Sequence, residues 1–163
     1  MFPSDTEEPS APIVPAGWHL APFWRRAIGL LVDTVVTWAP VFAVFYALGY
    51  TPGEAVADGR AVWLSVGITL VGLLHETLFV WRWGRTAGKF ATGTRVVSVL
   101  DGGALSLTRS FQRSLVTTTL GAIPQVGVLI GIGVYVWAFF DPMRQGVHDK
   151  AAGSIVVLNH RAA

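Results

Sequence analysis

The chain has 163 residues, of which 52% are hydrophobic and only 13% charged, and its mean hydropathy is +0.53. Soluble domains are usually less apolar, so we expect lipid rather than water around most of the chain. The 12 basic and 10 acidic residues give a net charge of +2 without a basic stripe, which argues against a nucleic-acid partner. The absence of cysteine excludes disulfides, cysteine metal sites and thiol catalysis.

The first 17 residues contain four prolines and three acidic residues and offer little that could form a core. This composition predicts a disordered, solvated tail, followed by one membrane domain over residues 18–160. A secretory signal begins with basic residues and has a short apolar stretch, whereas this start is acidic and the apolar stretch after it is long. We therefore expect an uncleaved first membrane span.

Two long apolar stretches follow, separated by a loop rich in proline and glycine. Residues 27–48 contain only one charged residue, Asp33, and residues 61–81 are interrupted only by His75 and Glu76. At 1.5 Å per residue, a helix of about 20 residues crosses roughly 30 Å of hydrocarbon. Both stretches are therefore predicted to be membrane-spanning helices.

The segment after the second span has a different character. In residues 84–106, GRTAGK turns the chain out of the span, and β-branched residues then flank an Asp-Gly-Gly turn, which is typical of a β-hairpin. Residues 154–158 (SIVVL) also read as a strand. This strand could pair with TRVVSVL (residues 94–100) only if both lie on the same side of the membrane.

Residues 107–140 are largely apolar but are broken by Pro124 and Gln125. They form either one long span, residues 115–140, or two shorter helices, residues 107–123 and 125–140.

Charge placement favours the two shorter helices. Basic residues precede the first span, gather between the second span and residue 113, and recur after Phe140, whereas the loop between the first two spans offers only Arg60. The positive-inside rule then places the amino terminus, residues 84–106 and the carboxyl-terminal tail in the cytoplasm, which requires an even number of crossings. The predicted fold is mainly α, an integral helical bundle of the cell membrane with four helices preferred over three and a small cytoplasmic hairpin-like segment.

Three polar residues inside the spans form the candidate intramembrane site: Asp33, His75 and Glu76. If the first two helices are antiparallel, all three lie at about the same depth, with Arg26 or Arg113 supplying the compensating charge. A carboxylate at that depth is costly unless it is protonated, paired or open to a polar cavity. In the alternative, Asp33 locks the helices together through an arginine and Glu76 extends to the interface.

No arrangement typical of a catalytic site stands out, so we expect no enzymatic activity and no cofactor. A metal site is not expected either, because adjacent residues such as His75 and Glu76 point about 100° apart on a helix. The expected partners are the lipid bilayer and either further copies of the chain or another membrane protein.

Three segments in this order resemble the RDD family of small bacterial membrane proteins. They are FWRRAIGLLVD (residues 23–33), GRTAGKFATGTRVVSVLDGGALS (84–106) and DPMRQGVHDKAAGSIVV (141–157). The resemblance implies a multi-pass membrane domain of largely unassigned function, with transport suggested for the family and sodium/proton exchange proposed for some members.

The resemblance also assigns the charges that name the family. The arginine falls on Arg25 or Arg26, the first aspartate on Asp33 and the second on Asp149, with Asp141 as the alternative. It further implies that the tail folds back so that Asp149 pairs with an arginine such as Arg26. The preferred function is cation or small-solute transport through the intramembrane site, and the rival is a scaffold or accessory subunit that transports nothing.

Overall fold

The computed structural model describes residues 14–51, 59, 61–121, 129, 133 and 136–159. Within these residues the chain is mainly helical and carries one small sheet of two strands. In chain order the elements are α1 (Phe23–Ala47), α3 (Ala61–Trp83), α4 (Ala87–Ala91), β1 (Thr94–Ser98), α5 (Leu107–Gly121), the 3-10 helix η1 (Trp137–Phe139), α7 (Val147–Ala151) and β2 (Ser154–Leu158).

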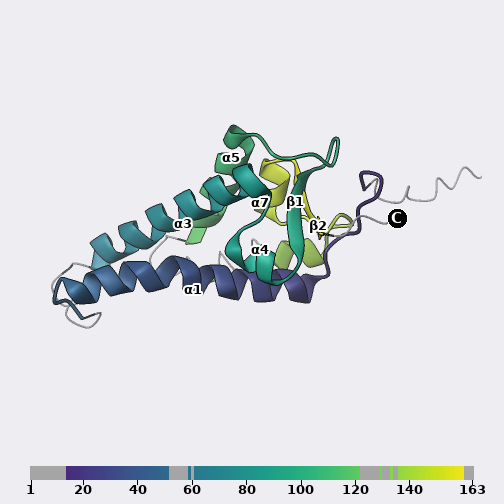
Figure 1. The fold of residues 1–163 in the computed structure, drawn as a ribbon. Coiled ribbons are helices and arrows are strands. Elements are labelled where there is room, and N and C mark those ends of the chain that lie inside the picture. Colours follow the sequence, from purple (N-terminus) through teal and green to yellow (C-terminus); the bar gives the residue numbers. More distant parts are fainter. Residues whose placement is uncertain are drawn as a thin grey trace, which may run out of the picture.

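The long helices α1 and α3 run side by side and dominate the shape (Figure 1). They have 25 and 23 residues, and both are long and apolar enough to cross a membrane. Only 11% and 6% of their most apolar windows are buried inside the protein. Their apolar side chains therefore face outward, as expected for helices solvated by lipid, and the two predicted spans are confirmed as helices.

The sheet joins segments that are far apart in the sequence. Strands β1 and β2 are antiparallel, with Thr94 opposite Leu158 and Ser98 opposite Ser154. The two segments do pair, as the sequence allowed if both lie on the same side of the membrane. The predicted hairpin is wrong: hydrogen bonds from Ser98 and Gly102 close the turn, and residues 103–106 form no strand. Strand β1 pairs with β2 instead of with residues 103–106. Four of the five residues of β2 are buried, so tertiary burial outweighs the local turn signal.

Apolar side chains cover both faces of the sheet. One cluster packs Val96 and Val156 against Val80 of α3, and the other contains Val97, Ile155 and Val157. Val14 and Trp18 also pack on the second cluster, so the last residues of the predicted tail, 14–17, lie at the sheet. Residues 1–13 of that tail fall outside the described residues.

Helix α4 was not expected from the sequence, and it lies directly against α1. The two backbones meet at Gly29 and Gly88, where a Cβ atom placed on Gly88 would stand 1.9 Å from the Gly29 carbonyl oxygen. Only glycine permits such a close approach. We call α4, β1, α7 and β2, together with the adjoining starts of α1 and α5 and the end of α3, the sheet end of the molecule; it lies opposite the end of α1 and the start of α3 (Figure 1).

Helix α5 covers the first of the two short helices predicted after the sheet segment, residues 107–123. Most of the second, residues 125–140, lies outside the described residues. The part that is described at its end, Trp137–Phe139, forms the 3-10 helix η1.

Candidate functional site

Asp149 lies at the centre of a buried charge cluster at the sheet end. It belongs to the short helix α7 and is completely buried. Its carboxylate accepts hydrogen bonds from Arg26 Nη2 (2.5 Å), Arg113 Nε (3.1 Å) and Ser154 Oγ (3.2 Å). The backbone N–H of Gly146 adds a fourth, at 3.1 Å. The expected pairing of Asp149 with Arg26 is confirmed.

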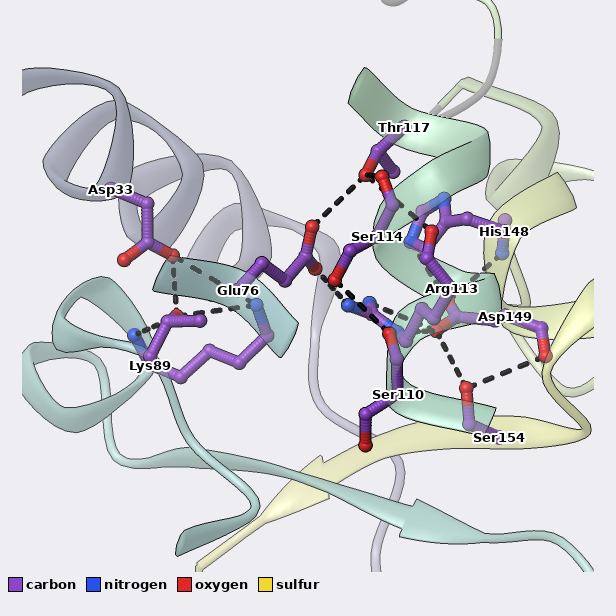
Figure 2. Close-up of polar contacts among 12 residues, drawn as sticks. Asp33, Glu76, Lys89, Ser110, Arg113, Ser114, Thr117, His148, Asp149 and Ser154 are labelled. Carbon is purple, nitrogen blue, oxygen red and sulfur yellow. Dashed lines mark hydrogen bonds and ion pairs between the residues drawn. The ribbon is translucent and has the colours of Figure 1, made fainter. Parts of the chain in front are cut away.

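Arg113 connects this aspartate to the membrane helices. Its side chain projects from α5, is 1% exposed, and forms ion pairs with both Asp149 and Glu76. Glu76 also accepts a hydrogen bond of 2.9 Å from Thr117 Oγ1 (Figure 2). Arg113 therefore supplies the compensating charge that the sequence assigned to either Arg26 or Arg113, and Glu76 pairs with it rather than extending to the interface.

Asp33 bonds to the start of α4. Its carboxylate accepts hydrogen bonds from Thr86 Oγ1 (2.5 Å) and from the backbone N–H of Gly88 (2.7 Å). The ammonium of Lys89 lies 3.8 Å from the same carboxylate. The expectation that Asp33 locks the helices through an arginine is thus corrected, because the cation beside it is a lysine on a helix that the sequence did not suggest.

Lys89 lies between the two carboxylates of the candidate intramembrane site. Figure 2 shows its side chain reaching between Asp33 and Glu76, and it interacts electrostatically with both. His75 lies to one side, with its ring 4.7 Å from that of Phe79 and its buried Nε2 atom without a hydrogen-bond partner among the described residues. The structure therefore brings Asp33 and Glu76 together around a shared cation, and leaves His75 outside their hydrogen bonds.

The charges of this cluster balance. Three cations, Arg26, Lys89 and Arg113, face three carboxylates, Asp33, Glu76 and Asp149. All six side chains are at most 16% exposed. Because removing one partner of a buried pair leaves the other uncompensated, at a cost of about 3–5 kcal/mol, the six charges stabilise the fold only as a set.

The pKa shifts of the groups outside the long helices follow from this arrangement. Burial opposes ionisation of Asp149, but the charges of Arg113 and Arg26 outweigh it and hold the pKa of this carboxyl far below its ordinary value. Burial lowers the pKa of His148 to about 4, so its ring is neutral at physiological pH. Burial also lowers the pKa of Lys89, and Arg113 adds to this effect, while Glu76 and Asp33 oppose it.

Sequence reasoning missed Lys89, Thr86 and Gly88, because GRTAGK was interpreted as a turn that leads the chain out of the second span. A usable signal was present. Thr86 stands where a helix N-cap belongs, and its hydroxyl accepts the backbone N–H of Lys89, three residues on, at 3.5 Å. A threonine before a short run of helix formers predicts a helix start, and that start is what bonds to Asp33.

The sequence profile of the RDD family matches residues 20–153, which include every charge of the cluster. The chain belongs to the RDD family. It is also 29% identical over 144 residues to the "Uncharacterized membrane protein YteJ" of Bacillus subtilis (strain 168), a match that covers 84% of this chain and 80% of that protein. No solved structure matches the chain. We therefore describe it as a membrane protein of the RDD family.

The structure separates the residues between which the RDD resemblance left a choice. Arg26 contacts Asp149, whereas Arg25 donates a hydrogen bond of 3.2 Å to the Thr92 carbonyl. Asp141 forms an ion pair of 2.5 Å with Lys150, outside the cluster. Among the alternatives, only Arg26 and Asp149 share the network that reaches Glu76.

Proposed function

We propose that this RDD protein is a non-enzymatic membrane protein that passes protons or another small monovalent cation through the site at Asp33 and Glu76. The observation that carries the proposal is the position of Lys89. Two carboxylates share one ammonium within the membrane domain, so an incoming cation that takes its place leaves the total charge of the site unchanged.

Lys89 is the most weakly held cation of the cluster. Arg113 and Arg26 are bound directly to carboxylates, whereas the Lys89 ammonium stands 3.8 Å from Asp33 and 3.3 Å from the Thr86 hydroxyl. Burial lowers its pKa, which makes loss of its proton easier than for an exposed lysine. A lysine that loses its proton or swings aside frees Asp33 and Glu76 to bind the transported ion.

The proposed topology has the amino terminus and the sheet end on the cytoplasmic side of the membrane. It rests on the basic residues at this end and on the even number of crossings that they require, with four helices in total. Four short helices enclose little space, so we propose that several copies assemble to complete the pathway.

The test is ion flux through liposomes that contain the purified full-length chain and a trapped pH-sensitive dye. We expect an imposed sodium or potassium gradient to drive proton movement, and we expect Asp33→Asn and Glu76→Gln to reduce it to the level of empty liposomes. Asp101→Asn is the matched control. That aspartate lies in the exposed turn after β1, so the substitution removes one carboxylate charge outside the site. Thermal unfolding of each variant in detergent separates loss of flux from loss of fold.

A scaffold without transport is the second candidate, and one observation favours it: every carboxylate of the cluster already has a cation beside it. On this alternative the cluster fastens α1, α3, α5 and α7 together. Wild-type protein that moves ions no faster than empty liposomes, although it is folded, overturns the transport proposal in favour of the scaffold.

A further inference from the structure

A cavity lies at the start of α1, outside the site at Asp33 and Glu76. It has a volume of about 320 Å³. Among the residues that the structure describes, its lining includes Pro22, Phe23, Arg26, Ala138, Phe139 and Arg144. Two arginines and two phenylalanines therefore border one small space, a combination that suits a ligand with an anionic part and an apolar part.

The cavity carries an excess of positive charge. Arg144 is exposed, and its guanidinium forms no ion pair within the described part of the chain. The charge of Arg26 is balanced within the buried cluster through Asp149, so the excess charge at the cavity is that of Arg144. Asp141, three residues before Arg144, is bound to Lys150. The surrounding acidic groups are thus engaged elsewhere, and the cavity has a charge that an anion would neutralise.

The backbone at Arg144 is strained. Its φ is +52°, in the left-handed region, where it is alone among the non-glycine residues that the structure describes. A residue other than glycine costs about 1 kcal/mol or more in this region. The Arg144 carbonyl accepts a hydrogen bond from Arg26, and its N–H donates to the Asp141 carbonyl at 2.8 Å. A glycine would make both bonds without backbone strain. Strained residues of this kind cluster at ligand-binding sites, so we infer that the Arg144 side chain contacts a ligand.

Exposed aromatic rings place this cavity at the membrane surface. Trp24 and Trp137 are 57% and 52% exposed, and Phe139 and Phe140 are 60% and 80% exposed. Tryptophan side chains such as Trp24 and Trp137 gather at the level of lipid head groups. A cavity at this level meets phospholipid phosphates more readily than it meets solutes of the aqueous phase.

We propose that this cavity binds the head group of an anionic phospholipid, with Arg144 and Arg26 holding the phosphate and Phe23 and Phe139 contacting the glycerol and upper acyl chain. The binding involves no covalent step and does not depend on ion transport.

The test measures which lipid stays with the protein. Full-length protein is reconstituted in nanodiscs with equal parts of phosphatidylglycerol and phosphatidylcholine of the same acyl chains, then released for native mass spectrometry. We expect wild type to retain phosphatidylglycerol preferentially, and Arg144→Gly to reduce that preference about tenfold, the effect of losing one charge-assisted contact. Glycine suits the left-handed backbone, so this variant should unfold at the wild-type temperature or above.

Arg82→Gln is the matched control, because it removes a positive charge from the end of α3 and does not line the cavity. It should leave the lipid preference unchanged. Equal retention of the two lipids by wild type, or an unchanged preference in Arg144→Gly, overturns the proposal. A further arm adds millimolar inorganic phosphate: displacement of phosphatidylglycerol would assign the cavity to free phosphate instead, and continued retention supports the lipid.

Discussion

The two ends of the long helices differ in their charge content and in how far their side chains are buried. Residues 34–47 of α1 and 61–74 of α3 contain no charged residue, and their large side chains, such as Val35 and Trp63, are mostly exposed toward lipid. At the sheet end, by contrast, six balanced charges are buried among five helices, α1, α3, α4, α5 and α7. Lipid solvates many apolar side chains equally well, whereas each buried charge requires one particular partner. The fold is therefore specified chiefly at the sheet end.

The strongest way to break this comparison is Asp149→Asn. The change leaves Arg26 without its carboxylate and Arg113 with only Glu76, so we expect a loss of about 3–5 kcal/mol in the free energy of unfolding. Thermal unfolding in detergent, followed by tryptophan fluorescence, measures it. Lys150→Met is the control, because that lysine is 48% exposed and its removal should cost about 1 kcal/mol or less. Equal effects of the two changes would show that the cluster is not critical.

Gly88→Ala tests the close approach of α4 to α1. The added methyl group overlaps the Gly29 carbonyl, so the two helices must separate and the bond from Gly88 N–H to Asp33 is lost, at a cost of about 3 kcal/mol. Gly72→Ala on α3 is the control, since its new Cβ would meet Thr37 at 3.4 Å, an ordinary contact. A Gly88→Ala protein as stable as the Gly72→Ala protein would contradict the close packing.

Acid should weaken the sheet end before it weakens the lipid-facing helices. The folded pKa of His148 is about 4, against 6.5 for an unperturbed histidine, so the unfolded chain binds this proton first as the pH falls. Stability present above pH 6.5 is thus lost between about pH 6.5 and 4, by about 3 kcal/mol. The depressed pKa of Asp149 adds a further loss below about pH 4.

Melting temperatures check this prediction. They are measured from about pH 8, where the histidine is neutral, down to about pH 4, the folded pKa of His148. His148→Gln removes the titrating ring, so its melting temperature should fall less over the same range. A variant that loses stability in parallel with wild type would assign the acid sensitivity to another group.

The smallest effect is expected on the lipid side. Leu70 is 53% exposed on α3, and Leu70→Val exchanges one apolar side chain for another where lipid replaces the lost contact. We expect the free energy of unfolding to change by about 0.5 kcal/mol or less. Val80, which is fully buried against the sheet, offers the comparison: Val80→Ala should cost about 2 kcal/mol, and similar values for the two changes would remove the distinction between the ends.

The features that could be predicted from the sequence are those that follow from hydropathy averaged over many residues and from the distribution of charges along the chain. The two spans, the pairing of β1 with β2 and the contact of Arg26 with Asp149 were all expected, the last through the family resemblance. Helix α4 was missed because five residues carry little periodicity, and its position depends on Gly29, more than 50 residues earlier. The hairpin prediction was wrong because a local turn signal does not reveal that a distant segment, residues 154–158, pairs with β1 instead of the residues directly after the turn.

The choice of cation beside each carboxylate was also beyond the sequence. Arg26 lies two turns before Asp33 on one helix and was one of the two arginines expected to compensate the intramembrane carboxylates, yet tertiary packing pairs Arg26 with Asp149 and places Lys89 beside Asp33. Helical spacing predicts which residues share a face, but a salt bridge depends on what another segment places against that face.

The pairing of β1 with β2 has a consequence for synthesis. The strand at residues 94–98 has left the ribosome some 60 residues before its partner, and Asp149 emerges in the same late segment. Until then, Arg26 and Arg113 have no carboxylate at residue 149, and one edge of β1 is open. The nascent chain thus inserts its apolar helices first and completes the buried charge cluster last. A chain that ends before this segment lacks both the partner strand of β1 and the carboxylate that binds Arg26 and Arg113.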